Sequence, residues 1–315
     1  MAEPGGFMPP GFRFSLRLGR LPEERGAAMT TTTRRTRTLT VERPEFRARV
    51  RLDQRNERLT LVSYEYYTTI APLAELLIDT ARQERLSKVV VVARGSDWEA
   101  FLTRGFALEA KAHRYFQGAP GHFMSYFLSA ERQVRDRLEE EQALLQTVLD
   151  RNQSPAHDLP EGYRMVTATV EQAGDLARLY ETVFESYPSP LTDEAYVREL
   201  IESGDGLFLL AVTEGGAIAS AAAAEIDRED GNAEITNCAT LPDHQGEGLM
   251  ATLVDALQKQ LAEQHIGCVY SMARAHSFGM NLILHRLGYI YRGRLIRHAH
   301  IGGGFEDLNL WENSR

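Results

Sequence analysis

The pattern of apolar and polar residues is most regular around residues 236–263, where a short apolar strand leads into a helix. The apolar residues of the helix recur every three or four positions, as on one face of an α-helix: Leu249, Leu253, Ala256, Leu257 and Leu261. Gly246 and Gly248 lie between strand and helix. Such a turn presents unpaired backbone N–H groups at the positive end of the helix dipole, which favours a bound anion. The sequence therefore predicts a phosphate-binding turn at residues 245–250.

The same patterns predict two α/β regions that are joined by a charged helix. Strands and helices alternate in residues 41–128. Residues 129–150 carry an apolar stripe at helical spacing and are followed by a Pro- and Asn-containing linker, so residues 129–158 are predicted to be a connector. The second region, residues 159–315, contains the glycine turn.

Residues 1–40 differ from the rest of the chain. They are rich in Gly, Pro, Arg and Thr and show no apolar period, so we predict a disordered tail. Met29 precedes a run of Thr and Arg, and translation from either Met1 or Met29 is compatible with the sequence.

Composition and charge narrow the class of protein. A chain that is 43% hydrophobic and 25% charged is typical of a soluble globular protein. No apolar run approaches the ~20 residues of a membrane span, and the net charge of −9 argues against a nucleic-acid partner. The two cysteines are too few for a disulfide framework and do not have metal-ligand spacing. We therefore expect a reduced, cytoplasmic protein with no metal and no membrane or nucleic-acid partner.

The order of the predicted elements, together with the turn Gln245-Gly-Glu-Gly248, resembles the GNAT family of acetyl-CoA-dependent N-acetyltransferases over residues 159–315. The family's loop reads Gln/Arg-x-x-Gly-x-Gly/Ala, and Met250 departs from it at the last position. The resemblance implies an α/β fold of the GNAT type, with a mixed, mostly antiparallel sheet flanked by helices. It also implies that acetyl-CoA is bound by residues of the strand, the turn and the helix after the next strand. These are Cys238, Ala239, Thr240, Gln245, Gly246, Glu247, Gly248, Leu249, Met250, Asn281 and His285.

Shorter segments are similar to the bacterial and archaeal β-lysine N6-acetyltransferases. They are residues 184–188, 270–275, 279–281, 287–289 and 304–311. This resemblance implies that the ε-amine of β-lysine is acetylated to Nε-acetyl-β-lysine, a compatible solute of osmoadaptation. It also implies that a lysine 2,3-aminomutase supplies the substrate.

That subfamily carries an N-terminal α/β extension of about the size of residues 41–128. Here the extension resembles a smaller, degenerate GNAT-like domain, because residues 90–106 parallel residues 270–289 but follow no glycine loop. We expect it to be structural and to complete the substrate cleft.

Acetyl transfer to an amine requires a neutral nucleophile, yet a lysine-type amine with a pKa of about 10.4 is mostly protonated at neutral pH. A general base is therefore useful, and Glu234, which begins the strand before the turn, is the candidate. Glu225 and Glu306 are rivals, and either could instead bind the second ammonium group of the substrate. In the resemblance, the position of the family's usual general acid is Leu284 here. Tyr289 is the candidate for that role, with its neighbour His285 and the cleft residues Tyr270 and Tyr187 as alternatives.

β-Lysine carries two ammonium groups and a carboxylate, so its site needs acidic side chains and an arginine. The residues that the resemblance places near the substrate are Glu185, Tyr187, Glu225, Arg274 and Glu306. Two alternatives stay open. The acceptor could be another small amine or a protein lysine, or the chain could be a non-catalytic acyl-CoA sensor or scaffold, which Met250 and Leu284 favour. Both a monomer and a homodimer are compatible with the sequence.

Overall fold

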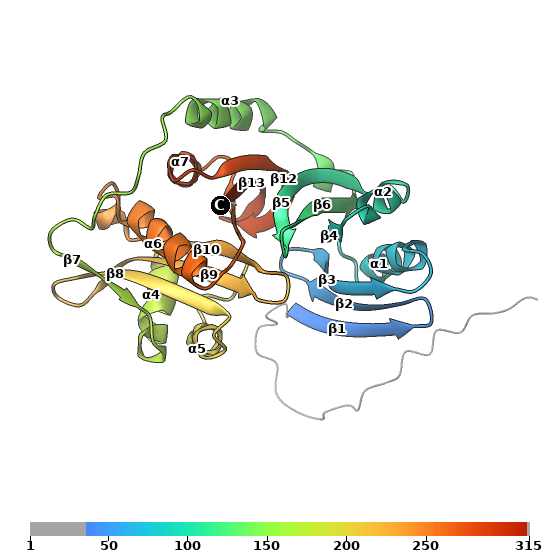
Figure 1. Ribbon diagram of the computed structural model, residues 1–315, viewed down its shortest axis with the longest axis horizontal. Coiled ribbons are helices and arrows are strands. Elements are labelled where there is room, and N and C mark those ends of the chain that lie inside the picture. Colours follow the sequence, from blue (N-terminus) through green and yellow to red (C-terminus); the bar gives the residue numbers. More distant parts are fainter. Residues whose placement is uncertain (1–35, 314–315) are drawn as a thin grey trace, which may run out of the picture. The chain divides into compact units, whose positions relative to one another are not determined.

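The computed structural model describes residues 36–313, and its first region is a layer of strands with helices on one face (Figure 1). Its elements are β1 (Thr36–Arg43), β2 (Phe46–Asp53), β3 (Arg58–Tyr66), α1 (Ala71–Gln83), β4 (Lys88–Arg94), α2 (Asp97–Leu102), β5 (Ala107–Phe116) and β6 (Ala119–Phe127). Alternate residues of β2, such as Phe46 and Val50, are buried in one hydrophobic cluster with Leu73 and Leu77 of α1. This is the period-two pattern of a half-buried strand.

The predicted tail falls mostly outside the described residues, as does the possible start at Met29. Residues 36–40 are a correction to that prediction, because they belong to β1. Their backbone pairs antiparallel with β2, from Thr36 opposite Asp53 to Arg43 opposite Phe46. Strand pairing of this kind needs no apolar period on the edge strand, and for that reason the sequence pattern missed it.

The connector contains a 3-10 turn, η1 (Glu131–Gln133), and α3 (Leu138–Leu149). The helix is shorter than predicted and begins with Glu139, Glu140 and Glu141 in its first turn, where acidic residues favour the helix dipole. Glu141 is buried and its carboxylate lies 2.9 Å from the guanidinium of Arg294. Burial raises the pKa of this carboxyl to about 7.

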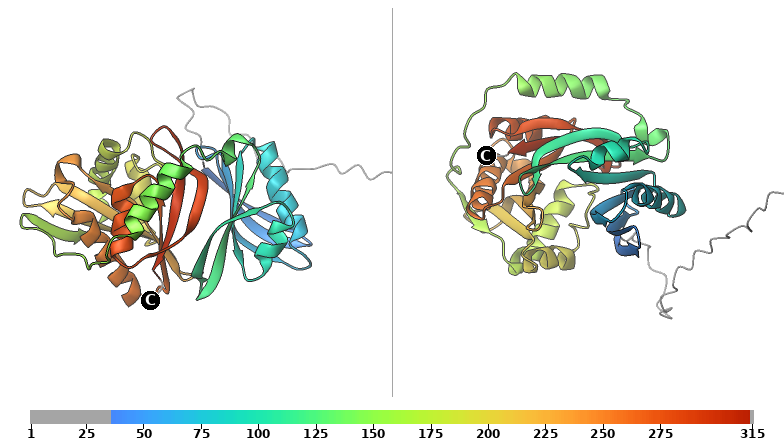
Figure 2. Two further views of the ribbon diagram at one scale, coloured as in Figure 1. Left: turned by 90° about the horizontal axis from the view of Figure 1, so that it is seen from above. Right: turned by 45° about the vertical axis from the view of Figure 1, so that its right-hand side comes forward.

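The second region carries helices on both faces of its strands (Figure 2). Its elements are β7 (Tyr163–Thr167), η2 (Val170–Gln172), α4 (Ala173–Val183), α5 (Glu194–Glu202), β8 (Gly206–Thr213), β9 (Ile218–Asp227), β10 (Asn232–Thr240), η3 (Pro242–His244), α6 (Leu249–Glu263), β11 (Cys268–Arg274), α7 (Phe278–Arg286), β12 (Ile290–Ile301) and β13 (Gly304–Asn313). One core cluster lies under α6 and α7, and another lies under α4 and α5.

All thirteen described strands join in one sheet, in the order β1-β2-β3-β4-β6-β5-β12-β13-β11-β10-β9-β8-β7. The β3–β4 and β10–β11 pairs are parallel and the others are antiparallel. This confirms the predicted mixed, mostly antiparallel sheet flanked by helices.

The two regions share this sheet because β5 pairs with β12, Ala110 opposite Gly293. Gly293 has φ +144°, and a side chain there would begin 2.4 Å from the carbonyl oxygen of Glu109, so only glycine allows this approach. The buried Lys88 amine reinforces the junction. It lies 3.0 Å from Glu109 Oε2 and donates to the carbonyl of Ile296 at 2.6 Å.

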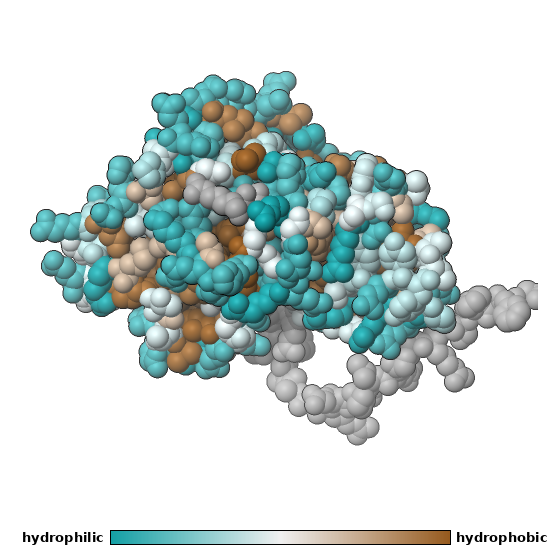
Figure 3. All heavy atoms as spheres, in the orientation of Figure 1, coloured by the Kyte–Doolittle hydropathy of each residue, from teal (hydrophilic) through white to brown (hydrophobic). Residues whose placement is uncertain are grey.

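The surface in view in Figure 3 is predominantly hydrophilic, with hydrophobic residues in small separate areas. None of the helices in residues 36–313 combines the length and hydrophobicity that crossing a membrane requires.

Candidate active site

The glycine turn, residues 245–248, precedes α6 and leaves the N-terminus of this helix exposed. Gly246 and Gly248 have φ +86° and +78°, a left-handed conformation that L side chains rarely adopt. Gly248 is the N-cap residue and no side chain caps the helix; its first turn also contains no acidic residue. Residues 245–248 are exposed. The first backbone N–H groups of a fifteen-residue helix are therefore available to an anion.

Met250 does not obstruct this turn. It is partly buried against the core cluster under α6, so its side chain packs toward the protein interior. The departure of this position from the GNAT loop pattern therefore leaves the exposed side of the turn unchanged.

A second opening lies between β10 and β11. Their parallel pairing runs only from Asn232 opposite Cys268 to Ile235 opposite Ser271, although β10 continues to Thr240 and β11 to Arg274. A β-bulge between Thr236 and Ala239 turns β10 at this point, and Asn237 takes φ +53°. The hydroxyl of Tyr180 donates to the Asn237 carbonyl at 3.0 Å and holds the bulge. Among residues 36–313, the main chain of β10 after Ile235 thus has no strand partner on the β11 side.

Glu234 and Glu225 lie directly opposite each other on β10 and β9, with their side chains on the same face of the sheet. Burial raises the pKa of Glu234 to about 8, and the charge of Glu225 adds to this rise. The positive charge of Arg58 and the hydroxyl of Tyr270, 3.5 Å from Glu234 Oε2, oppose it. Glu234 is therefore suited to accept a proton near neutral pH.

Glu225 has a different environment. Burial also raises the pKa of its carboxyl, but a hydrogen bond from Asn237 Nδ2 at 3.2 Å and the charge of Arg51 favour the ionised form. A carboxylate pair whose members are stabilised so differently divides into a charged partner and a proton acceptor. Glu225 has the surroundings of the charged partner.

Aromatic residues surround this acidic pair. The rings of Tyr115 and Tyr270 are 5.4 Å apart. Tyr187, in the loop after α4, packs on Phe184 at 4.5 Å and lies against Thr236. Burial raises the pKa of both Tyr187 and Tyr270, so each hydroxyl keeps its proton.

Sequence reasoning missed the contributions of the first region to this site, which are Arg51 and Arg58. The alternation of β2 predicts that Arg47, Arg49 and Arg51 share a face, but it does not show what that face meets. Tyr115, whose ring packs on Tyr270, was missed as well, since no local pattern distinguishes it from a packing residue.

The comparisons with known proteins agree with this geometry. The model of the Acetyltransferase (GNAT) family matches residues 176–289. N-acetyltransferase YodP of Bacillus subtilis (strain 168) is 33% identical over 256 residues, which are 81% of this chain and 92% of the relative. The chain belongs to the GNAT acetyltransferase family. Acetyl-CoA is the acetyl donor of GNAT enzymes, and this chain is an N-acetyltransferase.

Two archaeal relatives carry a more specific name. The β-lysine N(6)-acetyltransferase of Methanosarcina mazei is 32% identical over 260 residues, covering 76% of this chain and 95% of the relative. The protein of the same name from Methanococcus maripaludis is 27% identical over 242 residues, covering 77% and 88%. This GNAT chain is therefore similar to β-lysine acetyltransferases over most of its length.

The predicted acetyl-CoA residues fall into an exposed group and a buried group. Gln245, Gly246, Glu247 and Gly248 face solvent, and Gln245 Nε2 donates to the Thr240 carbonyl at 3.4 Å. Leu249 and Ala239 are buried in core clusters, so they can offer only their backbones. Thr240 Oγ1 lies 2.8 Å from Ser220 Oγ. Burial raises the pKa of the Cys238 thiol to about 12, which keeps it protonated and unsuited to be a nucleophile.

Asn281, another predicted acetyl-CoA residue, has its side-chain amide occupied by protein partners. It is fully buried and its Nδ2 donates to the carbonyls of Arg274 and Ser277, at 2.9 and 2.7 Å. Its Oδ1 accepts from Asn309 and Trp311 at 2.9 and 2.8 Å. With its amide engaged in this way, Asn281 fixes α7 against β11 and β13.

Tyr289 and His285 are also placed differently from the prediction. Tyr289 lies in the core cluster under α6 together with Ala233 and Ile235. Because side chains alternate along a strand, Glu234 points to the opposite face of the sheet. Tyr289 and Glu234 therefore do not face one another. His285 Nε2 lies 2.8 Å from the carbonyl of Arg151 and anchors the connector.

The other predicted substrate residues lie around the β12–β13 turn and the loop after α4. Arg274 Nη1 lies close to Gly302 of that turn, 3.9 Å from where a side chain would begin. Glu306 is 2.8 Å from His276 Nδ1. Glu185 is exposed at the end of α4. Each of the three thus has neighbours of its own, and the Glu225–Glu234 pair forms the centre of the candidate site.

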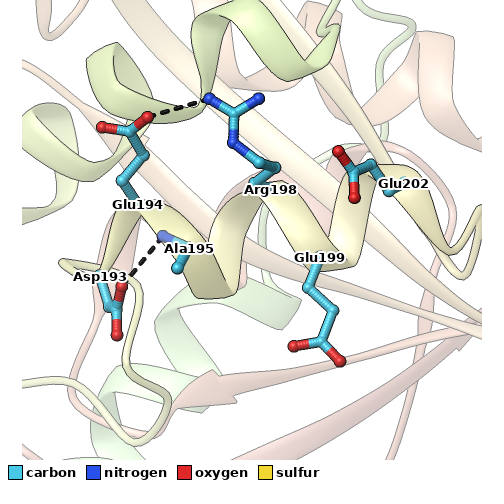
Figure 4. Close-up of a pocket in the computed structure, with 6 residues that line it drawn as sticks. All are labelled: Asp193, Glu194, Ala195, Arg198, Glu199 and Glu202. Carbon is cyan, nitrogen blue, oxygen red and sulfur yellow. Dashed lines mark hydrogen bonds and ion pairs between the residues drawn. The ribbon is translucent and has the colours of Figure 1, made fainter.

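An open hollow runs along α5 and is lined by Asp193, Glu194, Ala195, Arg198, Glu199 and Glu202 (Figure 4). Arg198 pairs with Glu194 at 3.0 Å, one helical turn away. None of the predicted site residues lines this hollow, and we assign it no role in catalysis.

Proposed function

We propose that this GNAT N-acetyltransferase acetylates the ε-amine of β-lysine and forms Nε-acetyl-β-lysine, a compatible solute. The observation that carries the proposal is the Glu225–Glu234 pair, which offers two differently tuned carboxylates beside the unpaired edge of β10. Two carboxylates suit an acceptor with two amines. The names of the two archaeal relatives support the same acceptor.

In this proposal Glu234 removes a proton from the reacting ammonium, because burial raises the pKa of its carboxyl to about 8. Glu225 binds the second ammonium group. The exposed N–H groups at the start of α6 bind the pyrophosphate of acetyl-CoA, and the edge of β10 holds its pantetheine arm. Bound acetyl-CoA supplies the acetyl group as a thioester. The protonated Cys238 thiol takes no covalent part, so the neutral amine would attack the thioester carbonyl directly, and the coenzyme A thiolate would leave as the C–S bond breaks.

Residues 41–128 are proposed to be a degenerate GNAT-like domain, residues 129–158 a connector, and residues 159–315 the catalytic domain. We also propose that a lysine 2,3-aminomutase supplies β-lysine. A gene for that enzyme beside this one would support the pathway, whereas the acetyl transfer itself does not depend on it.

Thiol release from acetyl-CoA with a panel of amines tests the proposal. We expect β-lysine to have a higher kcat/KM than α-lysine, spermidine or a lysine-containing peptide. A preference for one of the other amines would replace β-lysine as the acceptor. Tight binding of acetyl-CoA without thiol release with any amine would instead favour an acyl-CoA sensor.

A further inference from the structure

β2 and β3 turn a charged face away from α1. Arg49 and Arg51 are exposed between the buried residues of β2. On β3, Thr60 lies opposite Arg51 and Arg58 lies opposite Asp53. Directly opposite residues in an antiparallel pair have side chains on the same face. The face therefore combines three arginines with one buried carboxylate.

Hydrogen bonds connect this face to β12 and to the loop after α4 in the second region. Asp53 accepts from Asn56 Nδ2 at 2.6 Å. The Asn56 Oδ1 accepts from the backbone N–H of His300 at 2.8 Å, and its Nδ2 is 3.5 Å from the Pro188 carbonyl. Arg58 donates to the carbonyl of His298 at 3.2 Å. Pro188 follows Tyr187 in the loop after α4, so these contacts hold the end of β2 beside the acidic pair.

Arg51 has no hydrogen-bond or ion-pair partner in the described part of the chain, while Arg58 is engaged by Asp53 and His298. The charge of Arg51 nevertheless acts on Glu225 of β9 and on Tyr196 of α5. Arg51 stands two residues before Asp53 on the same face of β2, at the strand end that Asn56 holds against Pro188 and His300, so its unused donors lie at the edge of the site. A guanidinium in this position matches the planar, bidentate geometry of a carboxylate.

We infer that Arg51 binds the carboxylate of the acceptor while Glu225 binds its second ammonium group, so that the first region selects amino-acid acceptors over plain diamines. The inference rests on the proposed function, since Glu234 has to face the amine that is acetylated. A diamino acid places an opposite charge beside each of the three residues. A plain diamine leaves Arg51 without a partner and close to a second positive charge.

The test compares β-lysine with 1,4-diaminopentane, which keeps both amines and lacks the carboxylate. Initial rates are measured for the wild type, Arg51→Gln and Arg49→Gln. We expect Arg51→Gln to lower kcat/KM for β-lysine roughly 10–100-fold, mainly through KM, because a charge-assisted contact is lost. The rate with 1,4-diaminopentane should not fall. Arg49→Gln, an exposed arginine two residues away on the same face, should leave both acceptors unaffected.

The outcomes separate this inference from the proposed function. An equal loss with both acceptors, or no loss with β-lysine, would overturn the role of Arg51. Arg51→Lys should recover only part of the affinity, because an ammonium lacks the planar fork. If α-lysine is the preferred acceptor and depends on Arg51, the carboxylate site stands and β-lysine does not. If the wild type prefers spermidine, both fail, while acetyl transfer to an amine stands.

Discussion

The two regions of the molecule have the same strand order, yet only the second has an open cofactor turn. The first region runs β1-β2-β3-β4-β6-β5 and the second runs β8-β9-β10-β11-β13-β12, beyond which lies only β7. In each, one parallel pair is bridged by a helix: β3–β4 by α1, and β10–β11 by α6. The difference in function therefore arises within a common framework.

The turns before the two bridging helices differ in conformation. Residues 67–70 join β3 to α1 without glycine, and Pro72, in the first turn of α1, lacks a backbone N–H. Residues 241–248 join β10 to α6 and contain two glycines with positive φ. Only the second turn can present a row of free N–H groups to a phosphate.

The openings between the parallel strands differ as well. In the first region Tyr64 is buried there; its hydroxyl accepts from the Arg94 N–H at 3.0 Å and donates to Asp97 at 2.7 Å. Counted from the paired residues Arg58 and Asn232, the equivalent position in the second region is Cys238. In the first region, the hydroxyl of Tyr64 thus accepts a hydrogen bond from the main chain of β4. In the second region, the smaller side chain of Cys238 leaves the edge of β10 free. The two regions thus differ at two local places, the turn before the bridging helix and the opening between the parallel strands.

The largest expected effect concerns Glu234, whose place in the first region is taken by Thr60. Glu234→Gln should lower kcat ~10²–10⁴-fold, the usual contribution of a general base. Glu199→Gln, an exposed glutamate on α5, is the matched control and should retain full activity. Retention of activity by Glu234→Gln would transfer the role to another group, with Glu225 the first to test.

Cys238→Tyr would give the second region the side chain that fills the opening in the first. We expect acetyl-CoA affinity to fall roughly 10–100-fold, because overpacking of this size costs about 1–3 kcal/mol. Calorimetric titration of acetyl-CoA measures this effect, and Cys238→Ser serves as the control. Unchanged affinity in a folded Cys238→Tyr variant would contradict the equivalence of the two openings.

The pH dependence should reflect Glu234. Its ordinary pKa is 4.5 and burial raises it to about 8, so the folded state keeps a proton that the unfolded state has released. Stability should therefore fall as pH rises from about 4.5 to about 8. Activity should rise roughly tenfold per pH unit below that pKa, because the base must be ionised. In Glu234→Gln both trends should weaken, leaving only the titration of the amine. Identical profiles in the two proteins would argue against Glu234 as the base.

Gly248→Ala and Gly95→Ala compare positive-φ glycines from the two regions. A side chain at either would meet no atom within 4 Å, so each substitution acts through backbone strain alone. A strain of about 1 kcal/mol in the turn should raise KM for acetyl-CoA roughly fivefold in Gly248→Ala. Gly95→Ala should lose similar stability with KM unchanged. Equal KM values in the two variants would show that the turn does not bind the cofactor.

The smallest effect on activity is expected for Tyr64→Phe. Removing its hydroxyl leaves the Arg94 N–H and Asp97 without this partner, and the loss of stability should be about 1–3 kcal/mol. Steady-state rates should match those of the wild type, because Tyr64 fills this opening and no proposed site residue lies there. Chemical unfolding measures the loss of stability. A change in KM for acetyl-CoA would contradict the prediction, because it would show that Tyr64 affects cofactor binding in the second region.

The local patterns of the chain determined most of the elements and the position of the glycine turn. Apolar spacing predicted α6, and the glycines predicted its exposed N-terminus, because both depend on a few neighbouring residues. Glu234 and Glu225 were named individually from their strands and from the family resemblance. Their direct opposition was not predicted, because it depends on the register of β9 and β10.

Only the tertiary structure decided the rest of the site. In the folded protein, the side chain of Asn281 is part of a buried hydrogen-bond network and Tyr289 lies in the core. Both residues belong to segments that resemble the family. The tertiary structure also places the charge of Arg51 where it favours the ionised form of Glu225, 174 residues further along the chain. Helix spacing and turn conformation are local properties of a sequence. The pKa of Glu234 and the neighbours of Arg51 depend on burial and on long-range charges, which exist only once both regions have joined in one sheet.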